Sequence, residues 1–485
     1  MAAPASMTWL ESYLKDWRPG TGDPLGIREP ATGQTLVSVI QATTDDVARA
    51  AAAAAAAQPA WAAATYEDRS RVLRRVADLF EQHAKEFAVW TMRETGAVRH
   101  KTQDEQHFTH NEILNAATMP AQPYGSLMPS AHPARLSMVR RIPVGVVGAI
   151  TPWNSPTVLG VRVVAPALAL GNAVVLKPDP QTPVTGGAII AALFAEAGLP
   201  EGLLHIVCGG SEVGEALVTD PSVSMVSFTG STATGRRVAQ LAAKSLKKTS
   251  LELGGNNAFL VLEDADIDAA SSAGAWGSFH HQGQICMTAG RHLVHQNVAE
   301  AYLEAMVSKA KRLTVGDPYR EDVQLGPLMN ERQLARVDDI VKRSVASGAV
   351  LAEGGTHDGL FYRPTVLTNV TSDLPAFTDE IFGPVAPLMS FASDAEAIAL
   401  ANSTEYGLVA GIYTRSISRG LAIADRIKAG MVHINDQTVN DEAIVPFGGL
   451  GISGNGSRFG GAANFDEFTQ WQWVTVRDEP RSFPY

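Results

Sequence analysis

The feature that most constrains the fold of this chain is an alternation of short apolar runs with helical stretches, which begins at Val144. The apolar runs are bounded by Gly and Pro and predict strands over 144–150, 173–176, 203–207 and 225–228. The segments between them predict helices over 157–170, 184–197 and 235–246. This alternation is typical of a parallel sheet with crossover helices. Such sheets bind ligands beyond the carboxyl ends of their strands, so we expect a site in the loops at 151–156, 177–182 and 229–235.

The chain on either side of this region carries further helical and strand patterns. Residues 44–115 are predicted to be helical, with a first helix that contains eight consecutive alanines and that Pro59 should end. A second helix is predicted over 69–87. A second α/β region is predicted after Gly255, with a strand over 257–262 and helices over 269–279 and 299–313. The C-terminal residues alternate as in an edge strand.

Length and composition limit the class of protein. A single core stops growing at roughly 250–300 residues, so a chain of 485 residues predicts two or more domains. The hydrophobic fraction is 45% and the charged fraction 18%, which is a globular composition and excludes a disordered, collagenous or disulfide-dense protein. The net charge of −11 argues against a nucleic-acid partner, because phosphate binding needs a basic face.

Two segments of the chain, the N-terminus and the longest uncharged stretch, bear on targeting. The N-terminus lacks a basic region followed by an apolar one, as a secretory signal would have. The longest uncharged stretch lies between Arg141 and Arg162 and is broken by three prolines, whereas a spanning helix needs about 20 mainly apolar residues. We therefore expect a cytoplasmic protein without a membrane partner.

Only two cysteines, Cys208 and Cys286, are candidates for thiol chemistry. Two cysteines form no disulfide framework, which indicates a reducing compartment. Small and polar residues surround Cys286, which favours a reactive thiol, whereas Cys208 ends an apolar run and is expected to be structural. The neighbouring pair His280-His281 is not accompanied by further ligands at metal spacing, so no metal site is predicted. A Cys–His hydrolase remains open on residue types alone.

Two other segments carry candidate groups. Glu252 lies in an otherwise apolar run before two glycines, where desolvation penalises its charge. It is either an acid that reaches into a cleft or an ion-paired structural glutamate. Gly230 and Gly235 flank a predicted helix start without the Lys-Ser/Thr of a P-loop. That turn is either a phosphate cradle at a helix N-terminus or a tight connection.

Seven motifs, taken in order, resemble those of the NAD(P)-dependent aldehyde dehydrogenase superfamily over nearly the whole chain. The motifs are PWN at 152–154, LKP at 176–178, FTGST at 228–232, LELGGNN at 251–257, GQIC at 283–286, EIFGP at 380–384 and PFGG at 446–449. The resemblance implies an α/β fold with a Rossmann-type cofactor domain, an α/β catalytic domain and a β oligomerisation arm. The expected divisions are 1–122 and 144–251 for cofactor binding, 252–446 for catalysis, and 123–143 and 462–485 for the arm.

The resemblance also implies catalytic roles. Cys286 is the expected nucleophile, which forms a thiohemiacetal with the aldehyde and then a thioester. Asn154 and the backbone amide of Cys286 are expected to hold the oxyanion. Glu252 is expected to activate the water that hydrolyses the thioester. Relatives that transfer the acyl group to coenzyme A typically lack this acid, so a carboxylic acid is the expected product.

The cofactor residues implied by the resemblance are Trp153, Lys177, Gly230, Ser231, Glu380 and Phe382. One position departs from the family pattern. Many members have a glutamate three residues after the lysine, which binds the ribose hydroxyls and disfavours a 2′-phosphate, whereas this chain has Pro180 with Asp179 beside it. We therefore expect NAD to be preferred and NADP to be usable.

In the segments HINDQTVNDE at 433–442 and GNGSRFGGAANFDEFTQWQWVT at 454–475, the chain looks most like the NAD-dependent benzaldehyde and related aromatic aldehyde dehydrogenases of the superfamily. The expected aldehyde tunnel consists of Leu159, Arg162, Phe279, His280, Val445 and Phe447. Arg162 stands where many relatives have an aromatic residue, and it is expected either to contact the substrate ring or to pair with an acid at the domain interface. The alternatives are a dehydrogenase of aliphatic aldehydes or semialdehydes and a non-catalytic binding protein on the same fold. The C-terminal strand resembles the family's intersubunit strand, which implies a homodimer or homotetramer.

Overall fold

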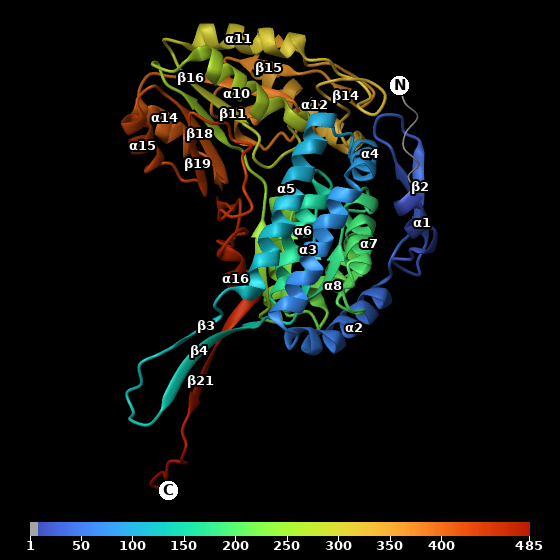
Figure 1. Ribbon diagram of the computed structural model, residues 1–485. Helices are drawn as coiled ribbons and strands as arrows, with labels where there is room; N and C mark the ends of the chain where they lie inside the picture. Colours follow the sequence, from blue (N-terminus) through green and yellow to red (C-terminus); the bar gives the residue numbers. More distant parts are fainter. Residues whose placement is uncertain (1–7) are drawn as a thin grey trace.

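The chain is organised around two large sheets and an extended arm, as the ribbon of the computed structural model shows (Figure 1). The structure describes residues 8–485. Residues 1–7 lie outside the described residues. They are the first part of the expected range 1–122 and of the N-terminal segment that lacks the pattern of a secretory signal. Within residues 8–485, every helix is too short or too polar to cross a membrane.

The first sheet is parallel and has five strands in the order β7-β6-β5-β8-β9. Its strands are β5 (Val146–Ile150), β6 (Ala173–Lys177), β7 (Leu204–Ile206), β8 (Met225–Thr229) and β9 (Lys248–Glu252). The predicted parallel sheet with crossover helices is therefore confirmed. All five residues of β6 are buried, as expected for a central strand covered on both faces.

Helices that connect these strands differ in part from the prediction. They are α6 (Pro156–Ala169), the π-helical turn η2 (Val184–Ala188), α7 (Ile189–Glu196), α8 (Ser211–Thr219) and α9 (Thr232–Ala243). Helix α8 was not predicted. Helix α9 begins three residues before Gly235 because Ser231 caps it by accepting a hydrogen bond from the Thr234 N–H.

The N-terminal part supplies a hairpin and a group of helices. Its elements are α1 (Thr8–Asp16), β1 (Pro24–Arg28), β2 (Thr35–Ile40), α2 (Thr44–Ala62), α3 (Tyr66–Gln82), α4 (Ala84–Thr95), α5 (Arg99–Thr118) and the 3-10 turn η1 (Met119–Ala121). The prediction that Pro59 ends the first helix is wrong, because α2 continues through it to Ala62. Trp61 holds this last turn, since its side chain is buried and its indole N–H donates to the Leu168 carbonyl at 2.8 Å. The helix predicted over 69–87 is divided at His83 into α3 and α4.

The second sheet has seven strands in the order β12-β15-β16-β11-β10-β18-β19, and only β12 runs antiparallel to its neighbour. Its strands are β10 (Ala258–Val261), β11 (Arg291–His295), β12 (Val350–Glu353), β15 (Thr365–Thr368), β16 (Val385–Phe391), β18 (Val409–Tyr413) and β19 (Met431–Ile434). Alternate residues of β10 enter different cores, with Leu260 on one face and Phe259 on the other. The α/β region predicted after Gly255 is therefore present.

Helices and short elements complete this second unit. The helices are α10 (Ile267–Phe279), the 3-10 turn η3 (His280–Gly283), α11 (Ala299–Arg312), α12 (Glu331–Ala346), α13 (Pro375–Thr378), α14 (Asp394–Ala401) and α15 (Ile417–Ala424). Helix α16 (Ala463–Phe468) instead packs against the first unit, since Phe468 lies in the core of that unit. The short strands are β13 (His357–Asp358), β14 (Phe361–Tyr362), β17 (Tyr406–Gly407) and β20 (Leu450–Gly451).

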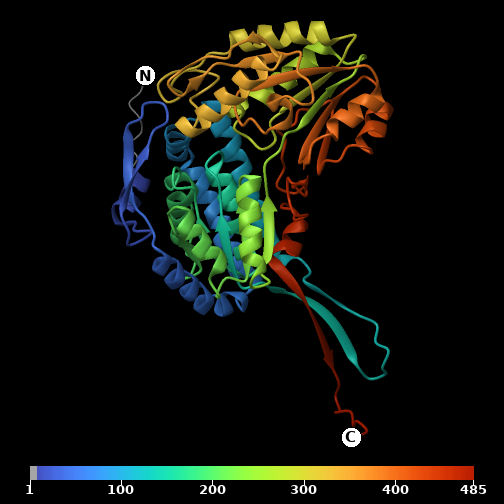
Figure 2. The same ribbon diagram turned by 180° about the vertical axis from the view of Figure 1, so that it is seen from behind.

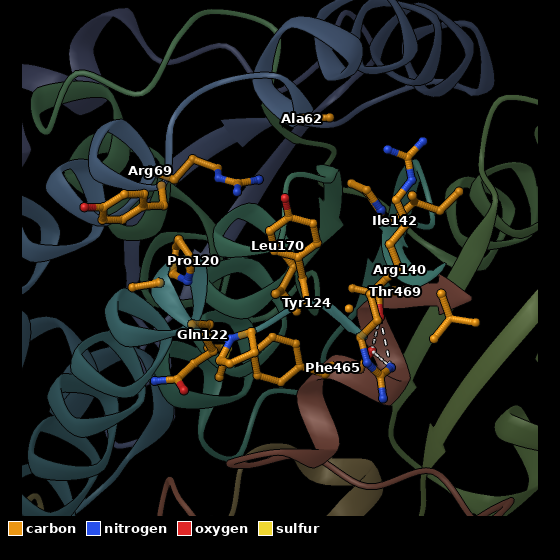
Figure 3. A pocket seen from close by; sticks show the side chains of 18 of the residues that line it. Ala62, Arg69, Pro120, Gln122, Tyr124, Arg140, Ile142, Leu170, Phe465 and Thr469 are labelled. Carbon is orange, nitrogen blue, oxygen red and sulfur yellow. Dashed lines mark hydrogen bonds between the residues drawn. The ribbon is translucent and has the colours of Figure 1, made fainter. Parts of the chain in front are cut away.

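The arm is a three-stranded antiparallel sheet that projects from the body and carries the C-terminus (Figure 2). It consists of β3 (Gly125–Leu127), β4 (Leu136–Pro143) and β21 (Thr469–Val476), with β21 on an edge as its alternation predicts. A hollow of about 1070 Å³ lies at its base, where Arg69, Tyr124 and Phe465 face one another (Figure 3). Large apolar side chains such as Trp473, which is 64% exposed, remain uncovered on the arm.

Candidate active site

The centre of the five-stranded sheet is where its strand order reverses. From β5 the chain passes to β6 on one side, and it later returns to β8 on the other. Loops that leave neighbouring strands in opposite directions open a crevice at their carboxyl ends, where α/β sheets bind ligands. The loop after β5 carries Trp153 and Asn154, and the turn after β8 carries Gly230 and Ser231. The topology therefore brings two of the predicted motifs to one crevice.

A cavity next to this crevice contains the three predicted catalytic residues. Asn154 from the loop before α6, Glu252 from the end of β9 and Cys286 from the loop after η3 all line it. Its walls are mainly apolar and include Phe108, Leu159, Val158, Ile285, Met287, Val439, Phe447 and Phe459. The site thus combines a thiol, a carboxyl and an amide with walls that suit an apolar or aromatic molecule.

Asn154 is buried and held from two directions. Its Nδ2 donates to the Gln284 carbonyl at 3.0 Å, two residues before Cys286 in the chain. Its own carbonyl accepts a hydrogen bond from Lys101 Nζ at 2.9 Å. An amide nitrogen has two hydrogens, so the second hydrogen of Nδ2 can serve an oxygen in the cavity.

The loop that carries Cys286 is also fixed at several points. His281 and Gln282 have positive φ angles of 50° and 57°. Gln282 donates to the carbonyls of Gly96 and Pro327, at 3.0 and 2.8 Å. The Cys286 carbonyl accepts from Asn257 Nδ2 at 2.8 Å. These bonds satisfy the irregular backbone and keep the nucleophile loop in one conformation.

The thiol of Cys286 is protonated at rest. Burial raises its pKa to about 12, and the nearby carboxyls of Glu380 and Glu252 act in the same direction. Cys286 nevertheless keeps partial exposure and lines the cavity. Cys208 is buried, with a raised pKa, as expected for a structural cysteine. The resting site therefore favours a thiol that is deprotonated during the reaction over a permanent thiolate.

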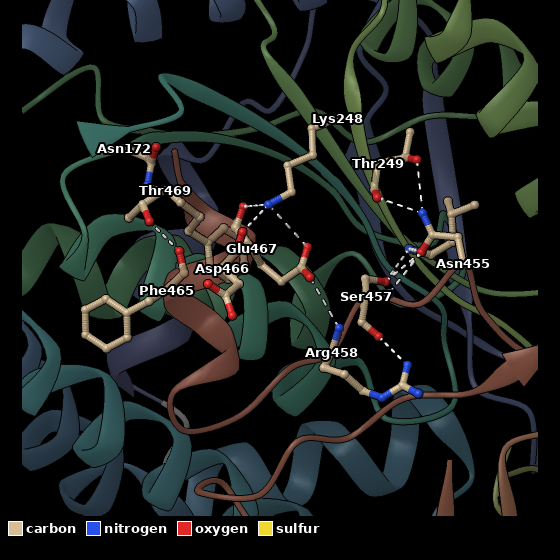
Figure 4. Close-up of polar contacts among 12 residues, drawn as sticks. Asn172, Lys248, Thr249, Asn455, Ser457, Arg458, Phe465, Asp466, Glu467 and Thr469 are labelled. Atoms are coloured by element: carbon tan, nitrogen blue, oxygen red, sulfur yellow. Dashed lines mark hydrogen bonds and ion pairs between the residues drawn. The ribbon is translucent and has the colours of Figure 1, made fainter. Parts of the chain in front are cut away.

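Glu252 is placed by the strand that precedes it and by a C-terminal segment that covers this strand (Figure 4). Asn455 binds two backbone groups on the outer edge of the strand, since its Oδ1 accepts from the Leu251 N–H at 3.1 Å and its Nδ2 donates to the Thr249 carbonyl at 2.8 Å. Lys248 Nζ donates to the Glu467 carbonyl at 2.6 Å. The edge of the sheet is therefore covered, and Glu252 is held at its end.

The carboxyl group of Glu252 has the environment of a base. It is buried, and neither of its oxygens has a hydrogen-bond partner among residues 8–485. Burial raises its pKa well above the usual 4.5, against the opposing effects of Arg458 and Arg162. An ion-paired structural role, the other interpretation of the sequence, does not fit an unpartnered carboxyl group. A carboxyl group with a raised pKa is a stronger base, which suits proton abstraction near neutral pH.

Several of the residues predicted to bind the cofactor have groups that fit a dinucleotide. The buried Lys177 Nζ makes only a long bond of 3.4 Å, to the Pro178 carbonyl, among the described residues, so its other hydrogens are available to ribose hydroxyls. Ser231 begins α9, whose N-terminal amides suit a phosphate. Trp153 and Phe382 meet edge to face with their ring centres 5.5 Å apart. Glu380 accepts from the Gly255 N–H at 2.9 Å, and burial raises its pKa to about 7.

The departure from the family pattern at Pro180 has a structural counterpart. Asp179, next to it, accepts hydrogen bonds from the backbone and side chain of Gln181, at 2.9 and 3.2 Å. Both bonds are accepted by the Oδ1 oxygen, so this oxygen of Asp179 caps a local turn.

Four of the six predicted tunnel residues line the cavity, namely Leu159, Arg162, His280 and Phe447. The expectation that Phe279 and Val445 do so is wrong. Phe279 ends α10 and packs into the core around β10 and β11, because the chain turns at the next residue. Val445 lies outside the wall and is 39% exposed, because residues 442–445 form a turn closed by the Val445 N–H and the Glu442 carbonyl.

Arg162 is paired with acids, in agreement with one of the two interpretations of the sequence. Its Nε donates to Glu112 at 2.8 Å and its Nη2 to Asp441, and all three side chains are nearly fully buried. Its guanidinium carbon also lies 5.0 Å from the ring centre of Phe447. The arginine therefore belongs to the cavity wall as part of a buried ionic group.

Several residues of the cavity were missed by the sequence analysis, including Lys101, Asp104, Glu105, Phe108 and Asp441. The first four lie on α5, more than 40 residues before the nearest motif, and a charged pair on a helix is normally solvent-exposed. Asp441 could have been identified from the sequence, since it lies between the strand β19 and the PFGG motif.

A crevice of this kind beside a thiol, an amide and a carboxyl defines an enzyme that forms a covalent thiol intermediate next to a nucleotide site. The model of the Aldehyde dehydrogenase family matches residues 17–474, and the chain belongs to this family. A vanillin dehydrogenase from Amycolatopsis sp. is 52% identical over 98% of this chain and 97% of its own length. A benzaldehyde dehydrogenase [NAD(+)] from Pseudomonas putida is 48% identical over 98% and 97%. Among solved structures, a betaine aldehyde dehydrogenase from Staphylococcus aureus in complex with NAD+ has a TM-score of 0.94 at 29% identity, covering 99% of each chain.

Proposed function

We propose that this protein oxidises an aromatic aldehyde of the benzaldehyde type to its carboxylic acid, with NAD as the preferred cofactor. The observation that carries this proposal is the placement of Cys286, Glu252 and Asn154 in one cavity with aromatic and aliphatic walls. The names of the relatives support the substrate class, since they are a vanillin and a benzaldehyde dehydrogenase. The structural relative solved with NAD+ supports the cofactor.

The first half of the reaction is acylation of Cys286. Its sulfur forms a bond to the carbonyl carbon of the aldehyde while the thiol proton leaves, and the carbonyl π electrons move to the oxygen. Asn154 Nδ2 and the Cys286 backbone N–H stabilise the oxygen that becomes negative. Because the thiol is protonated at rest, its proton leaves for the solvent, to which Cys286 is partly exposed, as the carbon–sulfur bond forms.

The cofactor would be held by Lys177, Gly230, Ser231 and Glu380, with Trp153 and Phe382 beside it. NAD, when bound, supplies the hydride acceptor that converts the thiohemiacetal carbon to the oxidation level of a thioester. Glu252 then takes a proton from water as the water oxygen attacks the thioester carbon. The carbon–sulfur bond breaks, the acid leaves, and the proton held by Glu252 passes to the sulfur, which restores the thiol of Cys286.

A matrix of aldehydes against NAD and NADP tests this function. Benzaldehyde and 4-hydroxybenzaldehyde should exceed an aliphatic aldehyde and succinate semialdehyde in kcat/KM by about 10²-fold, since each buried methylene or ring carbon contributes of the order of 1 kcal/mol. NAD should be preferred, with measurable NADP use because Pro180 stands where many members have the glutamate that disfavours a 2′-phosphate. A higher kcat/KM for succinate semialdehyde, or no NADH formation with any aldehyde, would refute the proposed substrate class.

Arg162 provides a separate prediction about stability. Arg162→Met leaves Glu112 and Asp441 as buried acids without their partner, and breaking such a group costs about 3–5 kcal/mol in free energy of unfolding. The matched control is Arg343→Met, which removes an exposed pair with Asp339 and should cost less than about 1 kcal/mol. Thermal unfolding of the two variants measures the difference, and equal melting temperatures would contradict it.

If Arg162→Met left kcat/KM unchanged for both benzaldehyde and 4-hydroxybenzaldehyde, direct contact of Arg162 with the substrate would be excluded.

We also propose the domain division and assembly that the motifs imply. The division comprises cofactor binding by 1–122 and 144–251, catalysis by 252–446, and an arm formed by 123–143 and 462–485. The separate five-stranded, seven-stranded and three-stranded sheets support it.

The exposed Trp471 and Trp473 and the hollow at the base of the arm support a homodimer or homotetramer. Sedimentation equilibrium would distinguish these states, and a monomer would contradict the proposal.

A further inference from the structure

The loop that carries Asn154 is tied to a helix that none of the seven motifs includes. Helix α5 lies along α6 (Figure 1), and Lys101 in its first turn reaches the loop between β5 and α6. There its Nζ donates a 2.9 Å hydrogen bond to the carbonyl oxygen of Asn154. The side-chain amide of the same asparagine is bound to the Gln284 carbonyl in the nucleophile loop. Asn154 is therefore held between α5 on one side and the Cys286 loop on the other.

Glu105, one turn further along α5, caps the N-terminus of α6. Ser155 occupies the N-cap position, yet among residues 8–485 its side chain makes no capping hydrogen bond. Glu105 Oε1 instead accepts the N–H groups of Thr157 at 3.0 Å and Val158 at 3.4 Å. A carboxylate at this end of a helix satisfies its free amides and interacts favourably with its dipole. The start of α6, directly after Asn154, is thus fixed from a different helix.

Lys101 and Glu105 also contact each other and form a buried ion pair. Their side chains are only 4% and 3% exposed, and both line the catalytic cavity. Desolvation makes a buried ion pair a weak source of stability compared with apolar side chains of similar volume. What the pair does supply is geometry, because the ammonium group fixes the Asn154 carbonyl while the carboxylate fixes the next turn of backbone.

We propose that Lys101 and Glu105 are positioning residues, which hold Asn154 where its amide can stabilise the oxygen that becomes negative when Cys286 attacks. The inference rests on the proposed function of Asn154. A displacement of about 1 Å in such a group costs up to about 10²-fold in rate, so an effect through Asn154 is measurable.

A double-mutant cycle on the acylation rate tests this coupling. The single variants are Lys101→Met and Asn154→Ala, and the readout is the first-turnover rate of NADH formation with benzaldehyde. Asn154→Ala should lower this rate by about 10²–10³-fold, as loss of an oxyanion donor does. Lys101→Met should lower it by about 10–100-fold while KM changes by less than about 3-fold, because the interaction acts on the transition state. In the Asn154→Ala background, Lys101→Met should cost less than about 2-fold more, because the residue through which it acts is already gone.

Two further variants keep the test decisive. Lys101→Met with Glu105→Gln removes both charges together and retains an acceptor for the Thr157 N–H, so it replaces Lys101→Met in the cycle if that single variant does not fold. Lys342→Met is the control, since it breaks an exposed pair with Asp338 at the same helical spacing, and it should leave the rate unchanged.

The possible outcomes separate this inference from the proposed function. If Asn154→Ala keeps the full acylation rate, the oxyanion role of Asn154 fails and the positioning role fails with it. If Asn154→Ala loses the rate but the effect of Lys101→Met is unchanged in that background, the role of Asn154 stands and the positioning role is overturned. A near-complete loss of the Lys101→Met effect in the Asn154→Ala background, which is a coupling energy close to the whole effect of the single variant, supports the inference.

Discussion

Replacing Cys286 by alanine lowers the rate of NADH formation from benzaldehyde by about 10⁴-fold or more, because no other group in the cavity can form the covalent intermediate. The alanine variant should still bind cofactor, since the predicted cofactor residues lie on other loops. Titration of the intrinsic tryptophan fluorescence with NADH measures this binding, and Trp153 stands among the cofactor residues. Loss of turnover with retained binding assigns Cys286 to the chemistry rather than to the structure.

Cys208→Ala provides the matched control, because Cys208 is the other cysteine of the sequence and is buried. This variant should keep its NADH formation within about 3-fold of the original protein, since removing a buried sulfur mainly costs packing. Comparable activity losses in both variants would count against Cys286 as the nucleophile. Retained turnover in Cys286→Ala would rule out thiol catalysis altogether.

Replacing Glu252 by glutamine should change the time course of the reaction in a different way. Acylation continues, because glutamine keeps the shape of the side chain, but hydrolysis of the thioester loses its general base. A rapid burst of NADH close to one equivalent per active site should be followed by a steady state about 10²–10⁴-fold slower. Rapid-quench or stopped-flow measurement separates the two phases. Loss of the burst to the same extent as the steady state would remove Glu252 from the deacylation step.

The raised pKa of Glu252 gives the same experiment a pH dependence. Below this pKa the carboxyl group is protonated and cannot accept a proton from water, so the deacylation rate rises as pH rises through it. Because burial moves the pKa well above 4.5, the acid limb of the kcat profile should lie at a higher pH than for an exposed glutamate. In Glu252→Gln this limb should disappear from the steady-state rate. A profile that is identical in the two proteins would assign the limb to another group.

Much of the site was accessible from sequence because its chemistry depends on residue types at the ends of strands. Trp153, Asn154 and Gly230 follow runs whose composition predicts buried parallel strands, and such strands end at one edge of a sheet. The two wrong expectations concern the direction in which a side chain points rather than its position in the sequence. Phe279 and Val445 are next to residues of the site in sequence, but a helix end and a tight turn point their side chains elsewhere.

The chemical groups and the parallel sheet could be predicted from the sequence, because strand periodicity and residue type are local properties. Which charges are buried together depends instead on the packing of segments that are far apart in the chain. Arg162 pairs with Glu112, which is 50 residues away in the chain, and with Asp441, which is 279 residues away. Lys101 donates a hydrogen bond to the Asn154 carbonyl, 53 residues away. A buried charge loses its hydration, so its free energy depends on the charged or polar group that lies against it. How distant segments pack determines which group that is.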